Sequence, residues 1–301
     1  MTEPNAPSAA PQGDPSGPAK PTRLWLVHNE ASGSNDEDAL NELRSALTAA
    51  GVTLLGETCF PREQPPTPAD LDDKQVDTVS VFAGDGTISS VVAGLADWNG
   101  TVLPLPGGTM NMLARRLHGD ATPAEIVARF DTGIVHRVRP TVLHSRHAVG
   151  LTGALAGPGT AWADVREAMR EPNLKDLVNT AGDAIASSAG GAKVVCRDTD
   201  CGRDEGYTAI SLTPREDGIE GTGYYSESLI DFARHGFALL QRDFRSGPHE
   251  TLGRHERIRL ACPDGEPMGL LIDGETYDGA VEEEFTLATS DVEFWATADA
   301  R

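Results

Sequence analysis

The sequence predicts an α/β protein of two domains: an N-terminal α/β layer sandwich with a mostly parallel sheet, and a C-terminal antiparallel β-sandwich. Up to about residue 133, β-type runs and helical runs alternate, which indicates a layered domain around a largely parallel sheet. Beyond that point, short β-type runs separated by turn residues favour an antiparallel sandwich. A chain of 301 residues with 39% hydrophobic content is long enough to bury a core in each domain.

Composition divides the chain into three segments. Residues 1–21 contain six prolines with Ala, Ser and Gly between them, so they cannot bury enough apolar surface to offset the entropy of ordering. We therefore expect a disordered tail over 1–21. The α/β domain is predicted over 22–133 and the sandwich domain over 134–301, with a helical insertion at about 160–188.

In the first domain, apolar β-type runs and amphipathic runs follow one another in order. The expected elements are a strand at 23–28, a helix at 35–50, a strand at 52–60, a short helix at 68–74, a strand at 78–83, a helix at 88–96, a strand at 102–105, and helices at 112–117 and 123–130.

In the second domain, the expected strands are short and separated by turn residues. They lie at 134–143, 192–197, 207–213, 257–262, 268–272, 281–286 and 291–296. Asp264-Gly265-Glu266 is read as the hairpin that joins two of them, because Asp-Gly is a frequent hairpin dipeptide.

The net charge excludes a nucleic-acid partner. It is −21, and no stripe of Lys and Arg is present that could displace counterions from a duplex. Long-range attraction to an anionic membrane is disfavoured for the same reason. A lipid substrate would therefore need a local apolar or arginine-bearing surface, such as the stretch around Arg115, Arg116 and His118.

No run of about 18 apolar residues and no secretory signal is readable, so the sequence predicts a cytoplasmic protein, with peripheral membrane contact as a further option. The four cysteines, at positions 59, 196, 201 and 262, are too scattered for a disulfide framework. Cys196 and Cys201 are expected to be ordinary thiols. A homodimer is left open.

Residues 79–119 hold the most informative feature, two glycine-rich turns that each follow a β-type run and open a helical one. The first is Gly84-Asp85-Gly86-Thr87, and the second is PGGTMN at 106–111. Glycines let the backbone approach an anion, and helix N-terminal amides then face it. Because ligands of a parallel sheet gather at the carboxyl ends of its strands, the pair predicts a phosphate-binding site.

These motifs, with an Asp-Gly-Glu at 273–275, resemble those of the diacylglycerol kinase catalytic-domain family, which includes sphingosine kinases and bacterial lipid kinases. Residues 29–33 (NEASG) are similar to the family's Asn-Pro-x-Ser-Gly loop. The resemblance spans nearly all of the chain beyond the tail. It implies a nucleotide-binding kinase domain at 22–133, a substrate domain at 134–301 and an active site in the cleft between them.

Carried over residue by residue, the resemblance implies ATP and Mg²⁺ as cofactors, a lipid substrate and transient contact with a membrane surface. The implied nucleotide contacts are Asn29, Ser32, Gly33, Thr58, Gly84, Asp85, Gly86, Thr87, Ser89, Ser90, Gly108, Thr109 and Asn111.

Phosphoryl transfer to a hydroxyl requires positioning, neutralisation of charge by Mg²⁺ and removal of one proton. Carboxylates supply the last two. Asp85, in the phosphate loop, is the expected metal ligand and a catalytic residue. The family places its proton acceptor and a nucleotide contact in the motif of Asp273 and Glu275, which completes the catalytic set. Whether Asp85 or Asp273 takes the proton stays open.

Two residues depart from the family pattern: Met110 replaces the usual glycine of Gly-Thr-Gly-Asn, and Ala83 replaces the first of two glycines. Both bear on nucleotide access. An acidic stretch that holds a second Mg²⁺ in some bacterial members is degraded at 226–231, so no second metal is predicted. The leading hypothesis is a lipid kinase acting on diacylglycerol or a sphingoid base. The alternatives are NAD-kinase-like phosphorylation of a soluble acceptor and a non-catalytic nucleotide- or lipid-binding regulator.

Overall fold

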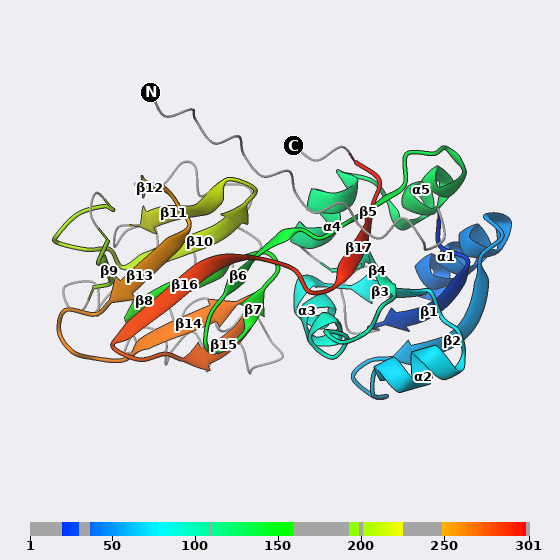
Figure 1. The fold of residues 1–301 in the computed structure, drawn as a ribbon, viewed down its shortest axis with the longest axis horizontal. Helices are drawn as coiled ribbons and strands as arrows, with labels where there is room; N and C mark the ends of the chain where they lie inside the picture. The colour runs from blue at the N-terminus through cyan, green and yellow to red at the C-terminus, as the bar shows by residue number, and fades with distance from the viewer. Residues whose placement is uncertain are drawn as a thin grey trace, which may run out of the picture.

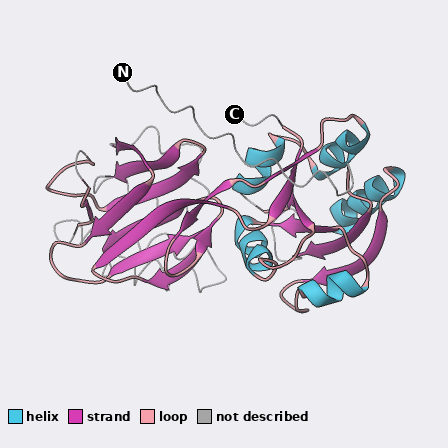
Figure 2. Ribbon diagram, in the orientation of Figure 1, coloured by secondary structure: helices cyan, strands magenta, loops and turns pink. Residues whose placement is uncertain are grey.

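The computed structural model describes residues 20–29, 37–108, 110–158, 193–198, 201–224 and 249–298. The chain forms two lobes, one of helices around a sheet and one made of strands (Figures 1 and 2). The predicted tail falls almost entirely outside the described residues. So do Ser32, Gly33, Thr109, the helical insertion and the degraded acidic stretch.

The first lobe is built on a sheet with the strand order β2-β1-β3-β4-β17-β5. Every pair is parallel except β17 with β5, so the sheet is mostly parallel, as predicted. The strands are β1 (Arg23–His28), β2 (Thr53–Cys59), β3 (Thr78–Ala83), β4 (Thr101–Pro106), β5 (His136–Val138) and β17 (Glu293–Ala296).

Helices cover both faces of this sheet, which confirms the layer sandwich. Leucines of α1 (Glu37–Ala49) and apolar residues of α5 (Pro123–Ala128) pack on one face. The other face packs against α2 (Pro68–Asp73), α3 (Asp85–Ala93) and α4 (Met112–His118). A 3-10 turn, η1 (Arg129–Asp131), follows α5. In Figure 1, α3 and α4 are the helices nearest the second lobe.

The second lobe is an antiparallel sandwich of two sheets around one apolar core. One sheet has the order β12-β11-β10-β8-β14-β15 and the other β7-β6-β16-β13-β9. The strands are β6 (Thr141–His144), β7 (Val149–Gly150), β8 (Ala154–Pro158), β9 (Val195–Cys196), β10 (Ala209–Arg215), β11 (Gly218–Tyr224), β12 (His249–His255), β13 (Arg257–Ala261), β14 (Met268–Ile272), β15 (Glu275–Asp278) and β16 (Glu282–Thr289).

The chain crosses between the lobes twice, which differs from the predicted boundary after Gly133. The run predicted as one strand at 134–143 splits at Pro140, where the missing N–H ends the pairing, into β5 of the first sheet and β6 of the sandwich. The last predicted strand returns as β17 and pairs with β4. Two strands assigned to 134–301 therefore belong to the first lobe.

Two further expectations are wrong. Asp264-Gly265-Glu266 joins β13 and β14, which lie in different sheets, so it forms a turn but no hairpin. Cys196 and Cys201 form a disulfide, with their Cα atoms 5.6 Å apart, within the range that a disulfide spans. Among the described residues, no helix has the length and apolar character needed to cross a bilayer.

Candidate active site

Strand register brings the two glycine turns together. β3 and β4 end side by side, with Ala83 paired to Pro106, and the turns that follow are in direct contact. A Cβ built on Gly108 would lie 2.5 Å from the Gly84 Cα, closer than two carbons can approach. The backbones therefore meet at a point where only glycine fits at position 108.

One asparagine ties the end of a neighbouring strand to the first turn, and another closes the second turn. Asn29, at the end of β1, donates from Nδ2 to Thr87 Oγ1 at 3.1 Å. Asn111 has φ 54° and closes the second turn, because its Oδ1 accepts from Gly108 N at 2.7 Å and its Nδ2 donates to Gly108 O at 2.8 Å. Both predicted residues lie at the same edge of the sheet as Gly84.

Asp85 links the two turns through its carboxylate. The residue begins α3 and is only 7% exposed, and its two oxygens accept from Met112 N at 2.9 Å and Leu113 N at 3.0 Å in the first turn of α4. Burial raises the pKa of Asp85, the two amides oppose that change, and the nearby charge of Asp273 adds to it. The side chain positions α4, and each oxygen retains a lone pair for a further ligand.

Asp273 joins the two lobes. With Gly274 it forms the two-residue turn of the β14–β15 hairpin, with φ 48° and 93° at these two residues. The predicted functional tripeptide is thus itself a hairpin turn. The Asp273 carboxylate accepts from Leu151 N, Thr152 N, Thr152 Oγ1 and Gly153 N at 2.5–3.1 Å, and from Ser89 Oγ of α3 at 2.6 Å.

Glu275 is the exposed member of the predicted catalytic set. Its Oε1 lies 3.4 Å from where a Gly86 Cβ would be, so the carboxylate faces the first glycine turn. No cluster of three or more His, Cys, Asp or Glu side chains in the described part of the chain could hold a metal by itself. The donor set fits a Mg²⁺ that takes most of its ligands from nucleotide phosphates, with Glu275 free to join them.

Other predicted residues lie apart from this arrangement. Thr58 is 3% exposed within β2, and its hydroxyl accepts from Trp25 Nε1 at 3.0 Å. Ser90 is exposed on α3, next to Ser89. Met110, the substitution expected to bear on nucleotide access, is buried, with 8% of its surface exposed. His118 is 1% exposed and does not contribute to a cationic surface.

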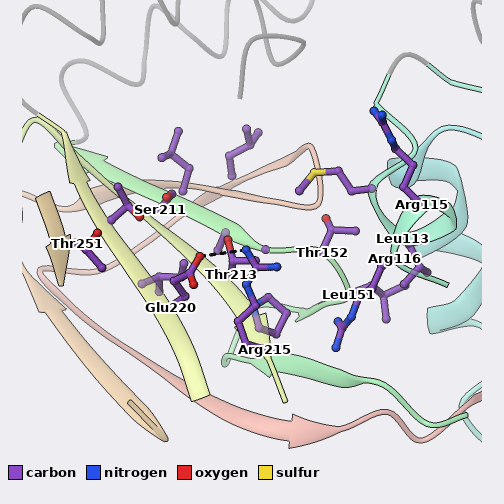
Figure 3. Close-up of a pocket in the computed structure, with 18 of the residues that line it drawn as sticks. Leu113, Arg115, Arg116, Leu151, Thr152, Ser211, Thr213, Arg215, Glu220 and Thr251 are labelled. Carbon is purple, nitrogen blue, oxygen red and sulfur yellow. Dashed lines mark hydrogen bonds and ion pairs between the residues drawn. The ribbon is translucent and has the colours of Figure 1, made fainter. Parts of the chain in front are cut away.

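A pocket of about 990 Å³ opens between α4 and the sheet formed by β8, β10, β11 and β12 (Figure 3). Its wall includes Met112 and Leu113, whose amides hold Asp85, and Leu151 and Thr152, whose amides hold Asp273. Sequence reasoning missed the segment 151–153, because it carries no motif and gains its role through backbone amides. The pocket therefore adjoins both carboxylates.

This fold, a layered α/β lobe with paired glycine turns joined to a β-sandwich, is the one expected from the motifs. Residues 23–142 match the family model described as the diacylglycerol kinase catalytic domain. The resemblance read from the motifs is thus confirmed over residues 23–142.

Solved structures agree on the fold. The chain resembles a “putative diacylglycerol kinase” from Bacillus anthracis str. Sterne with a TM-score of 0.57 and 15% identity, over 90% of this chain and 96% of the other. A structure described as a diacylglycerol kinase from the same organism gives a TM-score of 0.55 and 15% identity, over 92% and 97% of the two chains. None of the curated proteins matches the chain significantly.

Proposed function

We propose that this protein is an ATP-dependent lipid kinase that transfers the γ-phosphoryl group to a lipid hydroxyl. The observation that carries the proposal is the contact of the two glycine turns at Gly84 and Gly108, at one edge of a parallel sheet and facing Glu275 of the other lobe. Bare amides suit a triphosphate, and a carboxylate opposite them suits the Mg²⁺ that accompanies it.

In this proposal the nucleotide lies over the glycine turns, with Asn29 and Thr87 beside it, and the acceptor lies in the adjoining pocket. Two carboxylates support this placement of nucleotide and acceptor. Asp85 and Asp273 accept hydrogen bonds from backbone amides of residues that line the pocket, so they lie between the pocket and the glycine turns. Bound Mg²⁺ would neutralise phosphate charge, with Glu275 as the available protein carboxylate.

Asp273 is the proposed proton acceptor. Of its five donors, only Ser89 Oγ comes from the first lobe, and it occupies Oδ2. An acceptor hydroxyl that replaced Ser89 at this oxygen would lie between the pocket and the glycine turns. Four contacts from 151–153 would keep the carboxylate in place during the exchange.

The test is transfer of labelled γ-phosphate from ATP to extracted lipids, with NAD as a parallel acceptor. Glu275→Gln is the most informative variant, because this side chain is exposed and its loss leaves the fold intact. The matched control is Glu266→Gln, in the exposed Asp-Gly-Glu turn at 264–266. We expect Glu275→Gln to lower transfer about a hundredfold and Glu266→Gln to leave it unchanged.

The outcomes separate the proposal from its alternatives. Labelling of NAD instead of lipid would favour the soluble-acceptor reading. Binding of ATP with labelling of neither acceptor would favour a regulator. Equal transfer by wild type and Glu275→Gln would show that the carboxylate of the Asp-Gly-Glu turn has no part in the reaction.

A further inference from the structure

The pocket beside α4 is cationic in a strongly acidic protein. Its lining contains three arginines, Arg115, Arg116 and Arg215, and one carboxylate, Glu220, whereas the whole chain has 46 Asp and Glu against 25 Lys and Arg. In Figure 3, Arg116 comes from α4 and Arg215 from β10, on opposite walls of the pocket. Such a local excess of positive charge indicates an anionic occupant.

Arg116 has the environment of a ligand-binding arginine. It is half-buried, and it donates to Thr141 O at 2.9 Å and to Thr141 Oγ1 at 2.6 Å, two neutral acceptors. Within the described part of the chain it forms no ion pair, whereas Arg115 pairs with Asp120 and Arg215 with Glu220. Burial lowers the pKa of Arg116, the positive charge of Arg215 lowers it further, and the negative charge of Glu216 opposes the change in part.

Hydroxyl groups cover the sheet wall of the same pocket. Strand register places Ser211 of β10 beside Thr222 of β11, and Thr222 beside Thr251 of β12, so the three form a row across the sheet. Alternation along a strand turns Thr213 to the same face as Ser211. These groups can hydrogen-bond the hydroxyls and ester oxygens of a polar headgroup.

A neutral acceptor would be poorly accommodated here. A diacylglycerol filling the pocket would remove water from the Arg116 guanidinium without supplying an acceptor of opposite charge, which is costly. A phosphate ester would pair with the guanidinium through bidentate hydrogen bonds, the geometry that arginine favours.

We propose that the acceptor is an alcohol that itself carries a phosphate-ester anion, bound by Arg116 and Arg215 with its free hydroxyl directed to Asp273. The inference rests on the proposed kinase function. The acceptor oxygen forms the new bond to the γ-phosphorus, the bond from that phosphorus to the β–γ bridging oxygen breaks, and ADP leaves with the electron pair. The hydroxyl proton passes to the carboxylate.

The experiment compares short-chain acceptors that remain monomeric in solution. Dihexanoyl phosphatidylglycerol supplies the anion on a lipid, dihexanoylglycerol is its neutral counterpart, and glycerol 3-phosphate supplies the anion without a lipid. Binding is measured by calorimetry and turnover by labelled phosphate transfer. Arg116→Gln removes the charge and Arg116→Lys keeps it. Arg257→Gln, on an exposed side chain of β13 in the other sheet, controls for the change in net charge.

We expect wild type to bind the anionic lipid at least about tenfold more tightly than the neutral one, the effect of one charge-assisted hydrogen bond. Arg116→Gln should abolish this preference, and Arg116→Lys and Arg257→Gln should retain it. If glycerol 3-phosphate is used as well as the anionic lipid, the acceptor still carries a phosphate ester, but it is a soluble molecule and not a lipid.

Equal or tighter binding of the neutral lipid by wild type would overturn the inference, as would an equal loss of both ligands in Arg116→Gln. Failure of the kinase proposal looks different: none of the acceptors would be phosphorylated, while the binding measurements would still decide whether the pocket selects an anion.

Discussion

Alanine substitutions at Gly108 and Gly84 test whether the contact between the two glycine turns is needed for ATP binding. In Gly108→Ala the new Cβ would lie 2.5 Å from Gly84 Cα and 3.1 Å from Gly84 N, both backbone atoms that cannot rotate away. Ordinary contact needs about 0.9 Å more, so the turns must separate by that amount. Overpacking of this kind costs about 1–3 kcal/mol of unfolding free energy.

Gly84→Ala is the matched control. Its Cβ would meet Gly108 Cα at 3.6 Å, an ordinary van der Waals contact. Because Gly84 is the N-cap of α3, where alanine is disfavoured, we expect a loss of about 0.5 kcal/mol. Urea unfolding measures stability, and calorimetry with Mg²⁺ and ATP measures binding. If Gly84→Ala and Gly108→Ala changed stability and ATP binding by equal amounts, the contact between Gly84 and Gly108 would not be the basis of the site.

Three further predictions concern buried polar groups. Asp273→Asn should lower the unfolding free energy by about 1–3 kcal/mol, because the new amide group would face a backbone N–H that needs an acceptor. Ser89→Ala, which removes one donor to the same carboxylate, should lower it by about 1 kcal/mol. Similar losses in the two variants would contradict the assigned contacts. Burial lowers the pKa of His118 to about 3, so its contribution to stability is complete above the ordinary value of 6.5 and is lost as the pH falls towards 3. His118→Phe should remove that dependence in urea titrations. Burial raises the pKa of Asp85, so its contribution to the free energy of unfolding is present below the ordinary value of 3.8 and is lost as the pH rises through the raised value. Asp85→Asn should flatten this dependence of stability on pH. An unchanged dependence in the variant would contradict the role of Asp85.

Local patterns predicted most of the first lobe. The strand at 78–83 lies where its apolar run placed it, because that pattern depends on neighbours in the sequence. The helix predicted at 88–96 instead runs from Asp85 to Ala93, so Gly84 is its N-cap and the rest of the first glycine turn forms its first helical turn. The return of β17 to β4 was missed. Its apolar run suits either lobe, and only tertiary packing decides between them.

In the site, too, local motifs predicted some residues, and tertiary packing alone decided the others. Asn29, Asp85 and Asn111 were predicted from motifs, and the structure brings them to one edge of the sheet. Arg115 and Arg116 were expected to form an arginine-bearing surface, whereas the amides of 151–153 and the arrival of Arg215 on the other wall of the pocket have no local signature. They arise where the hairpin of Asp273 and the strands of the sandwich face α4. Motifs thus identify the side of the site that holds the glycine turns, whereas the side that holds the pocket requires the fold.

Titration of ATP with excess Mg²⁺ into wild type and Gly108→Ala by calorimetry tests the central claim most directly. If the touching glycine turns hold the triphosphate, wild type will give saturable heat below about 1 mM nucleotide and Gly108→Ala will give none. A folded wild-type protein that gives no heat in this range would contradict the account, and so would a Gly108→Ala variant that binds ATP as tightly as wild type.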